Sequence, residues 1–164
     1  MTHAIHKRRL LAVLTAVFTL FALLLMHPTA GAVDEEDELI GANIQDGVLL
    51  GYYGPGGDIV LPNTVTKIGD EALKGNKKIT GITIPGSVTD IGNNAFENCA
   101  NLERVTFTNP DKATENLLIR LGAFKDCTSR NDVEIPARAY QIVGNIFKGC
   151  TSLMNVKVNA NNPY

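Results

Sequence analysis

Three cysteines are the residues of this chain that most invite a chemical interpretation. Cys99, Cys127 and Cys150 could serve as redox groups, ligate a metal, form a disulfide or pack in a core. Each stands three residues after a phenylalanine, in the phrases AFENC, AFKDC and IFKGC. A phrase that recurs in this way indicates a structural repeat, so the cysteines must be interpreted with the elements around them.

The histidines that cysteine chemistry usually requires lie only near the N-terminus, at His3, His6 and His27. A cysteine nucleophile needs a neighbouring base, and zinc sites combine cysteine with histidine, often through C-x-x-C pairs. The chain contains no C-x-x-C pair, and its carboxylates are scattered without the spacing of an acid–base pair. We therefore expect no enzyme activity, no catalytic residue, no metal site and no cofactor.

The segment from Met1 to Ala32 has the organisation of a secretory signal peptide. A basic start, Lys7-Arg8-Arg9, precedes an apolar run from Leu10 to Met26, and Ala30-Gly31-Ala32 matches the small-x-small cleavage pattern. The alternative is an uncleaved membrane anchor, which the run is just too short to favour, because a span needs ~18 to 20 apolar residues. We expect a protein that is secreted or displayed at the cell surface, with membrane contact only through this peptide.

Residues 33–45 are expected to form an acidic, solvated leader, because they contain the run Asp34-Glu35-Glu36-Asp37-Glu38. The run lacks the D-x-D-x-D-G pattern of a calcium loop. Cleavage after Ala32 leaves 12 lysines and arginines against 17 aspartates and glutamates, a net charge of −5. An acidic surface repels phosphate, so nucleic acid is not expected as a partner.

The rest of the chain is dominated by an internal repeat. Phe124 and Phe147 are separated by 23 positions, which is the repeat length, and the block 61–83 aligns with the block 84–106. The third copy comes five residues late because of an insertion within TNPDKATENLLIR, and the fourth copy begins IPARAYQIV. Self-similarity at a fixed period is typical of solenoid proteins.

Each copy predicts the same succession of local structures. Alternating apolar residues, as in Leu102-x-x-Val105-x-Phe107, predict a short, half-buried strand. A second extended piece follows with Val88 and Ile91 inward, and the chain then enters a helical turn. Three residues share the inward face of that turn: Ala95, Phe96 and Cys99. One copy cannot bury this face alone, whereas stacked copies form a continuous core.

These features resemble the BspA-like leucine-rich repeats of bacterial surface and secreted proteins. The resemblance is carried by the pattern L-x-x-V-x-I-P-x-S-V-x-x-I-G-x-x-A-F-x-x-C and covers residues 47–164. It implies an α+β, β-rich repeat solenoid: a right-handed leucine-rich-repeat coil with short strands and single helical turns, in about four coils. Residues 46–62 then form an N-terminal hairpin or cap. The array 61–164 is expected to continue beyond Tyr164.

The third coil departs from this pattern at two places. Arg130 replaces the expected leucine, and Gly122-Ala123-Phe124 lacks a two-residue spacer. The resemblance is therefore weakest in this coil.

The repeat places the three cysteines in one column inside the wall of the solenoid, because stacked strands lie ~4.8 Å apart. A free cysteine behaves as a small buried hydrophobe, and Asn76 occupies the same slot in an earlier copy, so the slot accepts other residues. The alternative is a disulfide between neighbouring coils in an oxidising compartment, which would leave one thiol over. We expect packing.

Polar residues that flank the inward strand positions form a stripe, which is the candidate binding surface. Its members are Thr83, Arg104, Thr106, Asp132, Glu134, Asn155 and Lys157. Repeat proteins commonly bind partners on such extended surfaces. The competing interpretation is a merely solvated sheet face, because no aromatic residue anchors the stripe.

The sequence thus predicts a secreted or cell-surface repeat protein that binds a protein or a host-surface ligand. Adhesion is what the family resemblance implies. The alternative is a structural spacer, or an N-terminal module of a larger surface protein, with no ligand of its own. If the array instead ended at Tyr164, the last strand, Asn155–Val158, would leave an uncapped edge that a partner or a second copy of the chain covers.

Overall fold

A computed structural model describes residues 39–108 and 116–162 of the chain. The expected signal peptide, residues 33–38 of the acidic leader and the insertion segment 109–115 lie outside the described residues. Within the described residues, no helix is long and apolar enough to cross a membrane.

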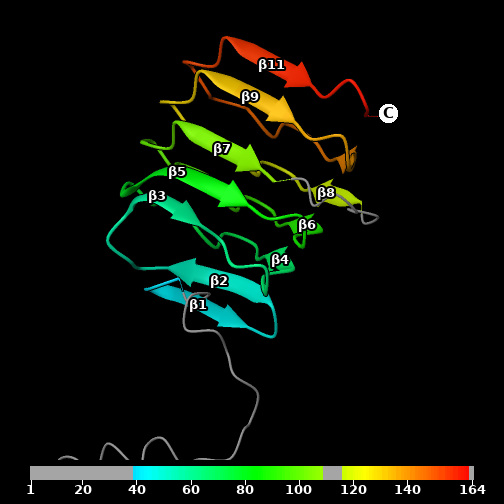
Figure 1. The fold of residues 1–164 in the computed structure, drawn as a ribbon. Helices are drawn as coiled ribbons and strands as arrows, with labels where there is room; N and C mark the ends of the chain where they lie inside the picture. Colours follow the sequence, from blue (N-terminus) through cyan, green and yellow to red (C-terminus); the bar gives the residue numbers. More distant parts are fainter. Residues whose placement is uncertain (1–38, 109–115, 163–164) are drawn as a thin grey trace, which may run out of the picture. The chain divides into compact units, whose positions relative to one another are not determined.

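The described chain is built from short strands that stack in a regular order (Figure 1). The strands are β1 (Ala42–Gln45), β2 (Val48–Tyr52), β3 (Gly57–Val60), β4 (Lys67–Ile68), β5 (Ile79–Ile84), β6 (Asp90–Ile91), β7 (Arg104–Phe107), β8 (Leu117–Ile119), β9 (Asp132–Ile135), β10 (Ala139–Ile142) and β11 (Asn155–Val158). β1 and β2 pair as an antiparallel hairpin around Asp46-Gly47, and the later pairs are parallel. We call β3, β5, β7, β9 and β11 the front strands.

The remaining strands form the back sheet, in the order β1-β2-β4-β6-β8-β10. The chain passes from a front strand to a back strand and through a turn to the next front strand, which makes a β-solenoid of about five turns. This confirms the predicted fold class. There is one turn more than the four expected coils, because β3 in the lead-in segment is already a front strand.

The parallel ladders have the register that the repeat predicts. Ile82 of β5 lies opposite Val105 of β7, and Ile68 of β4 lies opposite Ile91 of β6. The members of each pair are one repeat length apart in the sequence. Equivalent apolar residues therefore stack inside the solenoid, as a repeat protein requires.

The expected single helical turns are instead short hydrogen-bonded turns. The amide of Cys99 donates to the carbonyl of Phe96 at 3.1 Å, a contact across three residues. Asn98 takes a left-handed conformation, with φ of 59°, which a right-handed helix cannot continue through. The amide of Phe96 donates to the carbonyl of Ala123 in the next coil at 2.8 Å. Backbone groups that a helix would use internally thus join neighbouring coils.

A column of aromatic rings runs through the core beside these turns. The rings of Phe96 and Phe124 are stacked, with centroids 5.0 Å apart and planes inclined by 9°. Phe147 continues the column at 5.9 Å from Phe124. Phe96 is fully buried, which confirms the register that the repeat assigns to it.

Arg130 is the exception in this apolar interior. It occupies the repeat position of Ile79, Leu102 and Leu153, and its side chain has no solvent exposure. The guanidinium carbon lies 5.1 Å from the centroid of the Phe124 ring, while Nε and Nη1 have no hydrogen-bond partner. Burial lowers the pKa of Arg130 to about 10. A charged group therefore stands where the other coils have an aliphatic one.

Candidate binding face

The predicted stripe lies on the outward face of the front strands. Thr83 of β5 is opposite Thr106 of β7, and Arg104 is opposite Gly81. Asp132 of β9 is opposite Asn155 of β11, and Glu134 is opposite Lys157. Six of the seven residues are exposed and Thr83 is half-buried. The ladders thus bring the residues into two groups: Thr83, Arg104 and Thr106 form one, and Asp132, Glu134, Asn155 and Lys157 form the other.

The first group is ordered by an ion pair with a residue that the sequence interpretation missed. Asp58 of β3 accepts two hydrogen bonds from Arg104 Nη2, each at 2.9 Å, and one from the Thr80 hydroxyl at 2.7 Å. The hydrogen bonds from Thr80 and Arg104 lower the pKa of Asp58, and the Asp58 carboxylate raises the pKa of Arg104. Arg104 also contacts Glu103 at 3.0 Å. Its charge is therefore neutralised within the face.

The second group is joined by amide–carboxylate hydrogen bonds. Asn155 Nδ2 donates to Asp132 at 2.7 Å, and Asn159 Nδ2 donates to Glu134 at 3.3 Å. Neither carboxylate forms an ion pair with a described residue. This half of the face therefore presents carboxylate acceptors that no described cation reaches at ion-pair distance, with Lys157 opposite Glu134 on the neighbouring strand.

The two groups are separated by an interruption of the front strands. β3, β5 and β7 form one ladder and β9 and β11 another, and no ladder joins β7 to β9 in the described chain. A hollow of about 690 Å³ lies at the interruption, lined by stripe residues such as Arg104, Thr106 and Asp132. A smaller hollow of about 190 Å³ lies between Thr106 and Glu134. We call these two hollows the front cleft. The stripe residues thus follow successive front strands, but the front cleft separates those on β5 and β7 from those on β9 and β11.

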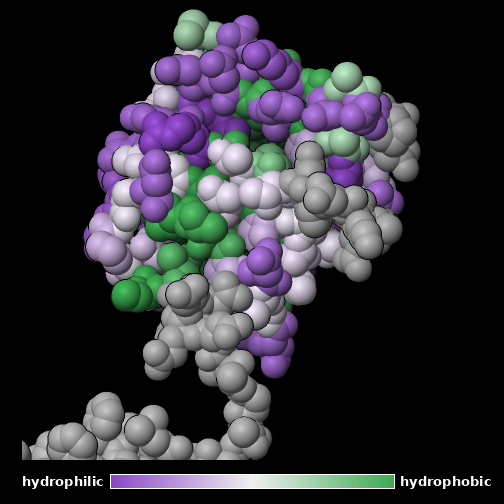
Figure 2. Space-filling model, viewed as in Figure 1, coloured by the Kyte–Doolittle hydropathy of each residue, from purple (hydrophilic) through white to green (hydrophobic). Residues whose placement is uncertain are grey.

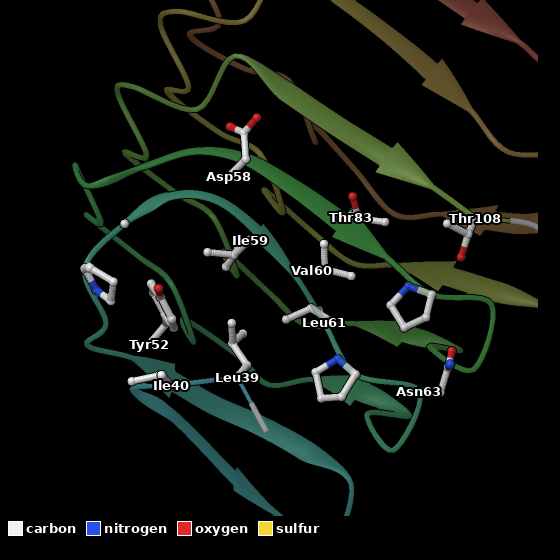
Figure 3. Close-up of a pocket in the computed structure, with 14 residues that line it drawn as sticks. Leu39, Ile40, Tyr52, Asp58, Ile59, Val60, Leu61, Asn63, Thr83 and Thr108 are labelled. Atoms are coloured by element: carbon white, nitrogen blue, oxygen red, sulfur yellow. The ribbon is translucent and has the colours of Figure 1, made fainter. Parts of the chain in front are cut away.

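A second concavity borders the stripe at the other end of the front face. A groove of about 570 Å³ runs between β3 and the hairpin, and Thr83 contributes to its wall (Figure 3). The apolar residues on it include Val60 and Ile40, whose exposed fractions are 64% and 78%. Figure 2 shows the surface as hydrophobic toward β2 and β3 and mostly hydrophilic over β7 and β9. The front face therefore offers one apolar and one polar concavity.

The repeat in the sequence contains a signal for Asp58. Asp58 precedes Gly81 by one repeat length, as Gly81 precedes Arg104. Extending the repeat one unit toward the N-terminus would have placed Asp58 on the stripe. The apolar groove could not be predicted from the repeat in this way. Its walls come from the hairpin, β3 and β5, and only the folded chain brings these segments together.

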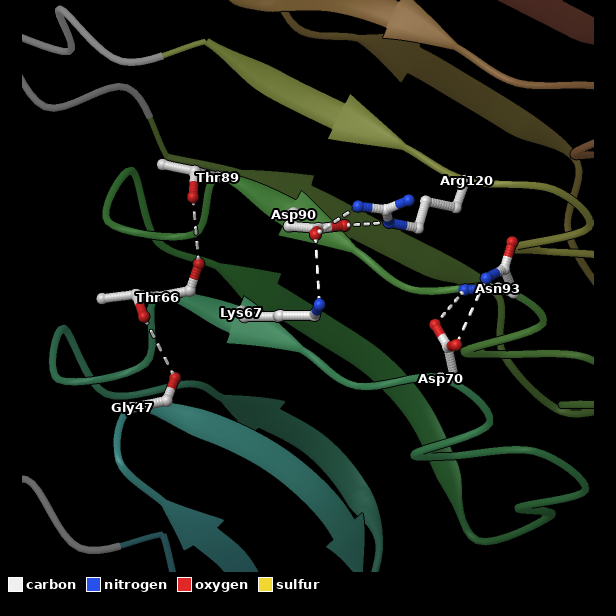
Figure 4. Close-up of polar contacts among 8 residues, drawn as sticks. All are labelled: Gly47, Thr66, Lys67, Asp70, Thr89, Asp90, Asn93 and Arg120. Carbon is white, nitrogen blue, oxygen red and sulfur yellow. Dashed lines mark hydrogen bonds and ion pairs between the residues drawn. The ribbon is translucent and has the colours of Figure 1, made fainter.

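Charged side chains on the back sheet are paired with one another (Figure 4). Asp90 of β6 accepts hydrogen bonds from Arg120 at 2.8 and 2.9 Å and lies 3.3 Å from Lys67 Nζ. Burial opposes ionisation of Asp90, but the contacts with Arg120 and Lys67 outweigh it, so its pKa is lowered. The carboxylate of Asp70 accepts hydrogen bonds from the backbone amide and the side-chain amide of Asn93.

The cysteines lie in the predicted column as free thiols. The thiol of Cys99 donates to the carbonyl of Leu73 at 3.0 Å, and Asn76, in the same slot one coil earlier, donates to the carbonyl of Tyr52 at 3.3 Å. Burial raises the pKa of Cys99 and of Cys127 to about 12. These thiols are therefore protonated hydrogen-bond donors at neutral pH, which disfavours reactivity.

No group of three or more histidine, cysteine, aspartate or glutamate side chains in the described chain is placed to hold a metal ion. What the front face does supply is hydrogen-bond donors, acceptors and two hollows.

Comparison with solved structures places this architecture among bacterial repeat proteins. A leucine-rich repeat protein from Bacteroides capillosus is 27% identical, with a TM-score of 0.52, over 69% of this chain and 86% of that one. The pneumococcal vaccine antigen PcpA is 24% identical, with a TM-score of 0.55, over 68% of this chain. A leucine-rich cell surface protein from Faecalibacterium prausnitzii is 22% identical, with a TM-score of 0.54, over 69% of this chain.

The described solenoid is short beside two of these proteins. The matched region spans 32% of PcpA and 35% of the Faecalibacterium protein. No curated protein matches the chain significantly. The family model for the BspA type leucine-rich repeat region matches residues 56–163, with six copies. This chain therefore belongs to the family of BspA-type leucine-rich repeat proteins.

Proposed function

We propose that this protein is a secreted or cell-surface binding protein that engages a protein or host-surface ligand through its front face, without catalysing a reaction. The observation that carries the proposal is the polar stripe, held on stacked strands and hollowed at its middle by the front cleft. A rigid scaffold that presents polar groups around a hollow is a common arrangement for binding. Adhesion is the form of binding that the family resemblance favours.

Two further observations support a surface location. Residues 1–32 have the organisation of a signal peptide, and two structural relatives are described as a vaccine antigen and a cell surface protein. The net charge of −5 after cleavage argues against nucleic acid as the ligand. The competing proposal is a spacer with no ligand of its own.

Binding to an array of host extracellular-matrix and cell-surface proteins distinguishes these proposals. A binding protein gives saturable retention that falls when Asp132→Asn and Glu134→Gln together remove two negative charges from the stripe. Gln45→Lys with Asn116→Lys is the matched control, because it changes the net charge equally at two exposed positions outside the stripe. Retention that is absent, or that is equal in all variants, would favour the spacer.

We also propose self-association through the outer edge of β11. Its four residues are exposed, including Val156 at 51% and Val158 at 57%, and only β9 pairs with it in the described residues. Exposed apolar side chains on a strand edge favour pairing with another chain. Val158→Lys should lower the apparent mass measured by sedimentation at high concentration. A mass that is monomeric at all concentrations would contradict this proposal.

A further inference from the structure

The junction between β7 and β9 lacks the backbone bonds that join the other front strands. The carbonyls of Asn131 and Ile135 accept amides from the β11 segment, at 3.2 Å from Asn155 and 3.0 Å from Asn159. In a parallel ladder, main-chain groups of alternate residues point to opposite neighbours. Those of Asp132 and Glu134 therefore face β7, where no described residue pairs with them. Among the described residues, this junction therefore lacks the ladder that joins the other front strands.

Arg130 lies just before β9, in the same coil. Its guanidinium is buried beside Phe124, and two of its nitrogens have no hydrogen-bond partner among the described residues. A buried cation whose donors are not all satisfied costs more than the aliphatic side chain that other coils place there. The buried guanidinium of Arg130 thus destabilises the closed arrangement of this junction.

The rear of the same junction is firmly connected. β8 and β10 pair in the back sheet, with Ile119 opposite Ile142. The thiol of Cys150 donates to the carbonyl of Phe124 at 3.0 Å. Arg138 reaches back to the carbonyls of Val88 at 2.6 Å and Pro85 at 3.2 Å. A rear joined by hydrogen bonds, and a front where the described residues of β7 and β9 meet without a backbone ladder, form the geometry of a hinge.

We infer that the step between β7 and β9 is a hinge that opens and closes the front cleft in the free protein. The back sheet is the pivot, and opening relieves the buried charge of Arg130 by admitting water. The inference goes beyond the proposed function, because the motion requires no ligand. It also implies that the distance between the two halves of the stripe is variable.

Distances between spin labels on the front strands test the hinge. Labels at Thr106→Cys and Lys157→Cys span two strand steps across the junction, and labels at Val60→Cys and Thr106→Cys span two steps within the first ladder. Cys150→Ser removes the only half-buried native thiol, and Cys99 and Cys127 are buried. The pair across the junction should show a distance distribution at least about twofold wider than the other pair.

Arg130→Leu supplies the second arm of the experiment. It should narrow the distribution across the junction and leave the pair within the first ladder unchanged. Arg120→Leu is the control, because it removes a guanidinium from the back sheet. Equally narrow distributions for both pairs in the parent protein would overturn the inference, even if Arg130→Leu failed to fold. A junction that stays wide in a folded Arg130→Leu protein would overturn the role of Arg130.

Discussion

The thiol of Cys127 donates a hydrogen bond to the carbonyl oxygen of Phe96, one coil earlier, at a distance of 3.1 Å. Cys99 and Cys150 make the equivalent contacts with Leu73 and Phe124, each at 3.0 Å. The cysteine column is therefore a chain of donors that each satisfy a buried carbonyl of the preceding coil.

The three thiols should differ in reactivity with a maleimide reagent in the native protein. Cys150 is half-buried, whereas Cys99 and Cys127 have no solvent exposure and their pKa is raised to about 12. Burial raises the pKa of Cys150 as well, so partial exposure is what distinguishes it, and Cys150 should label first. Mass spectrometry of denatured but unreduced protein should then find all three labelled. Loss of two labels would establish a disulfide.

Removal of a phenylalanine ring from the column should be costly. Phe96→Ala deletes a fully buried side chain that stacks on Phe124 at 5.0 Å. We expect a loss of ~3 to 5 kcal/mol in the free energy of unfolding, from lost burial and a residual cavity. Urea melts measure it. Thr106→Ala on the exposed face is the control and should cost within ~0.5 kcal/mol. Equal, small losses would show that the register is wrong.

Replacement of the buried arginine should stabilise the protein. Arg130→Leu restores the residue type of the other coils and removes a cation with two unpartnered nitrogens. We expect a gain of about 1–3 kcal/mol in urea melts, because an unsatisfied buried polar group carries a penalty of that order. Arg130→Met, which keeps a long side chain but removes the charge, should give most of the same gain in the free energy of unfolding. Destabilisation by both variants would contradict this account.

The ion pairs of the back sheet should make stability depend on pH in the acid range. The pKa of Asp90 lies below its ordinary value of 3.8 in the folded protein. Its stabilising contribution is thus fully present above that value and is lost as the pH falls through the folded pKa. Asp90→Asn should cost about 1–2 kcal/mol at pH 7 and flatten this acid dependence.

Asp46→Asn is the matched control for Asp90→Asn. Asp46 is exposed in the hairpin turn, forms no ion pair with a described residue, and has φ of 49°, a conformation that asparagine tolerates. Urea melts from pH 2 to pH 7 should give the parent profile for this variant. An unchanged profile in Asp90→Asn as well would mean that the network contributes nothing.

Export should remove residues 1–32. The Ala30-Gly31-Ala32 pattern predicts cleavage after Ala32, so the mature protein should begin at Val33. The intact mass of protein recovered outside the cell measures this directly. Protein found only in membranes at full mass would contradict secretion.

Periodicity was enough to predict the parallel ladders. One repeat length sets Ile82 opposite Val105, and the structure has that pair. Periodicity could not predict the turns correctly. The spacing of Ala95, Phe96 and Cys99 fits a helical face, but the left-handed residue Asn98 and the hydrogen bonds to the next coil decide against a helix.

The front cleft depends on features of the chain that depart from the repeat. Arg130 was visible in the sequence as a departure from leucine, yet the separation of β7 from β9 depends on how two coils fit together. The apolar groove likewise requires the hairpin to approach β3. Such features are set by packing between segments, which a single repeat does not encode.

The short spacing between paired strands has a consequence for the order in which the chain folds. Paired strands β5 and β7 are one repeat length apart in the sequence, so the coil that contains β7 closes a loop of modest entropy on the coil before it. Folding should therefore nucleate in one well-packed pair of coils and spread to its neighbours. The contact between Arg138 and Val88 spans 50 residues and must wait for two coils to be in place. Folding that starts near Phe96 should therefore pause at the step from β7 to β9. This step should form completely only when Arg138 has bound the carbonyl of Val88.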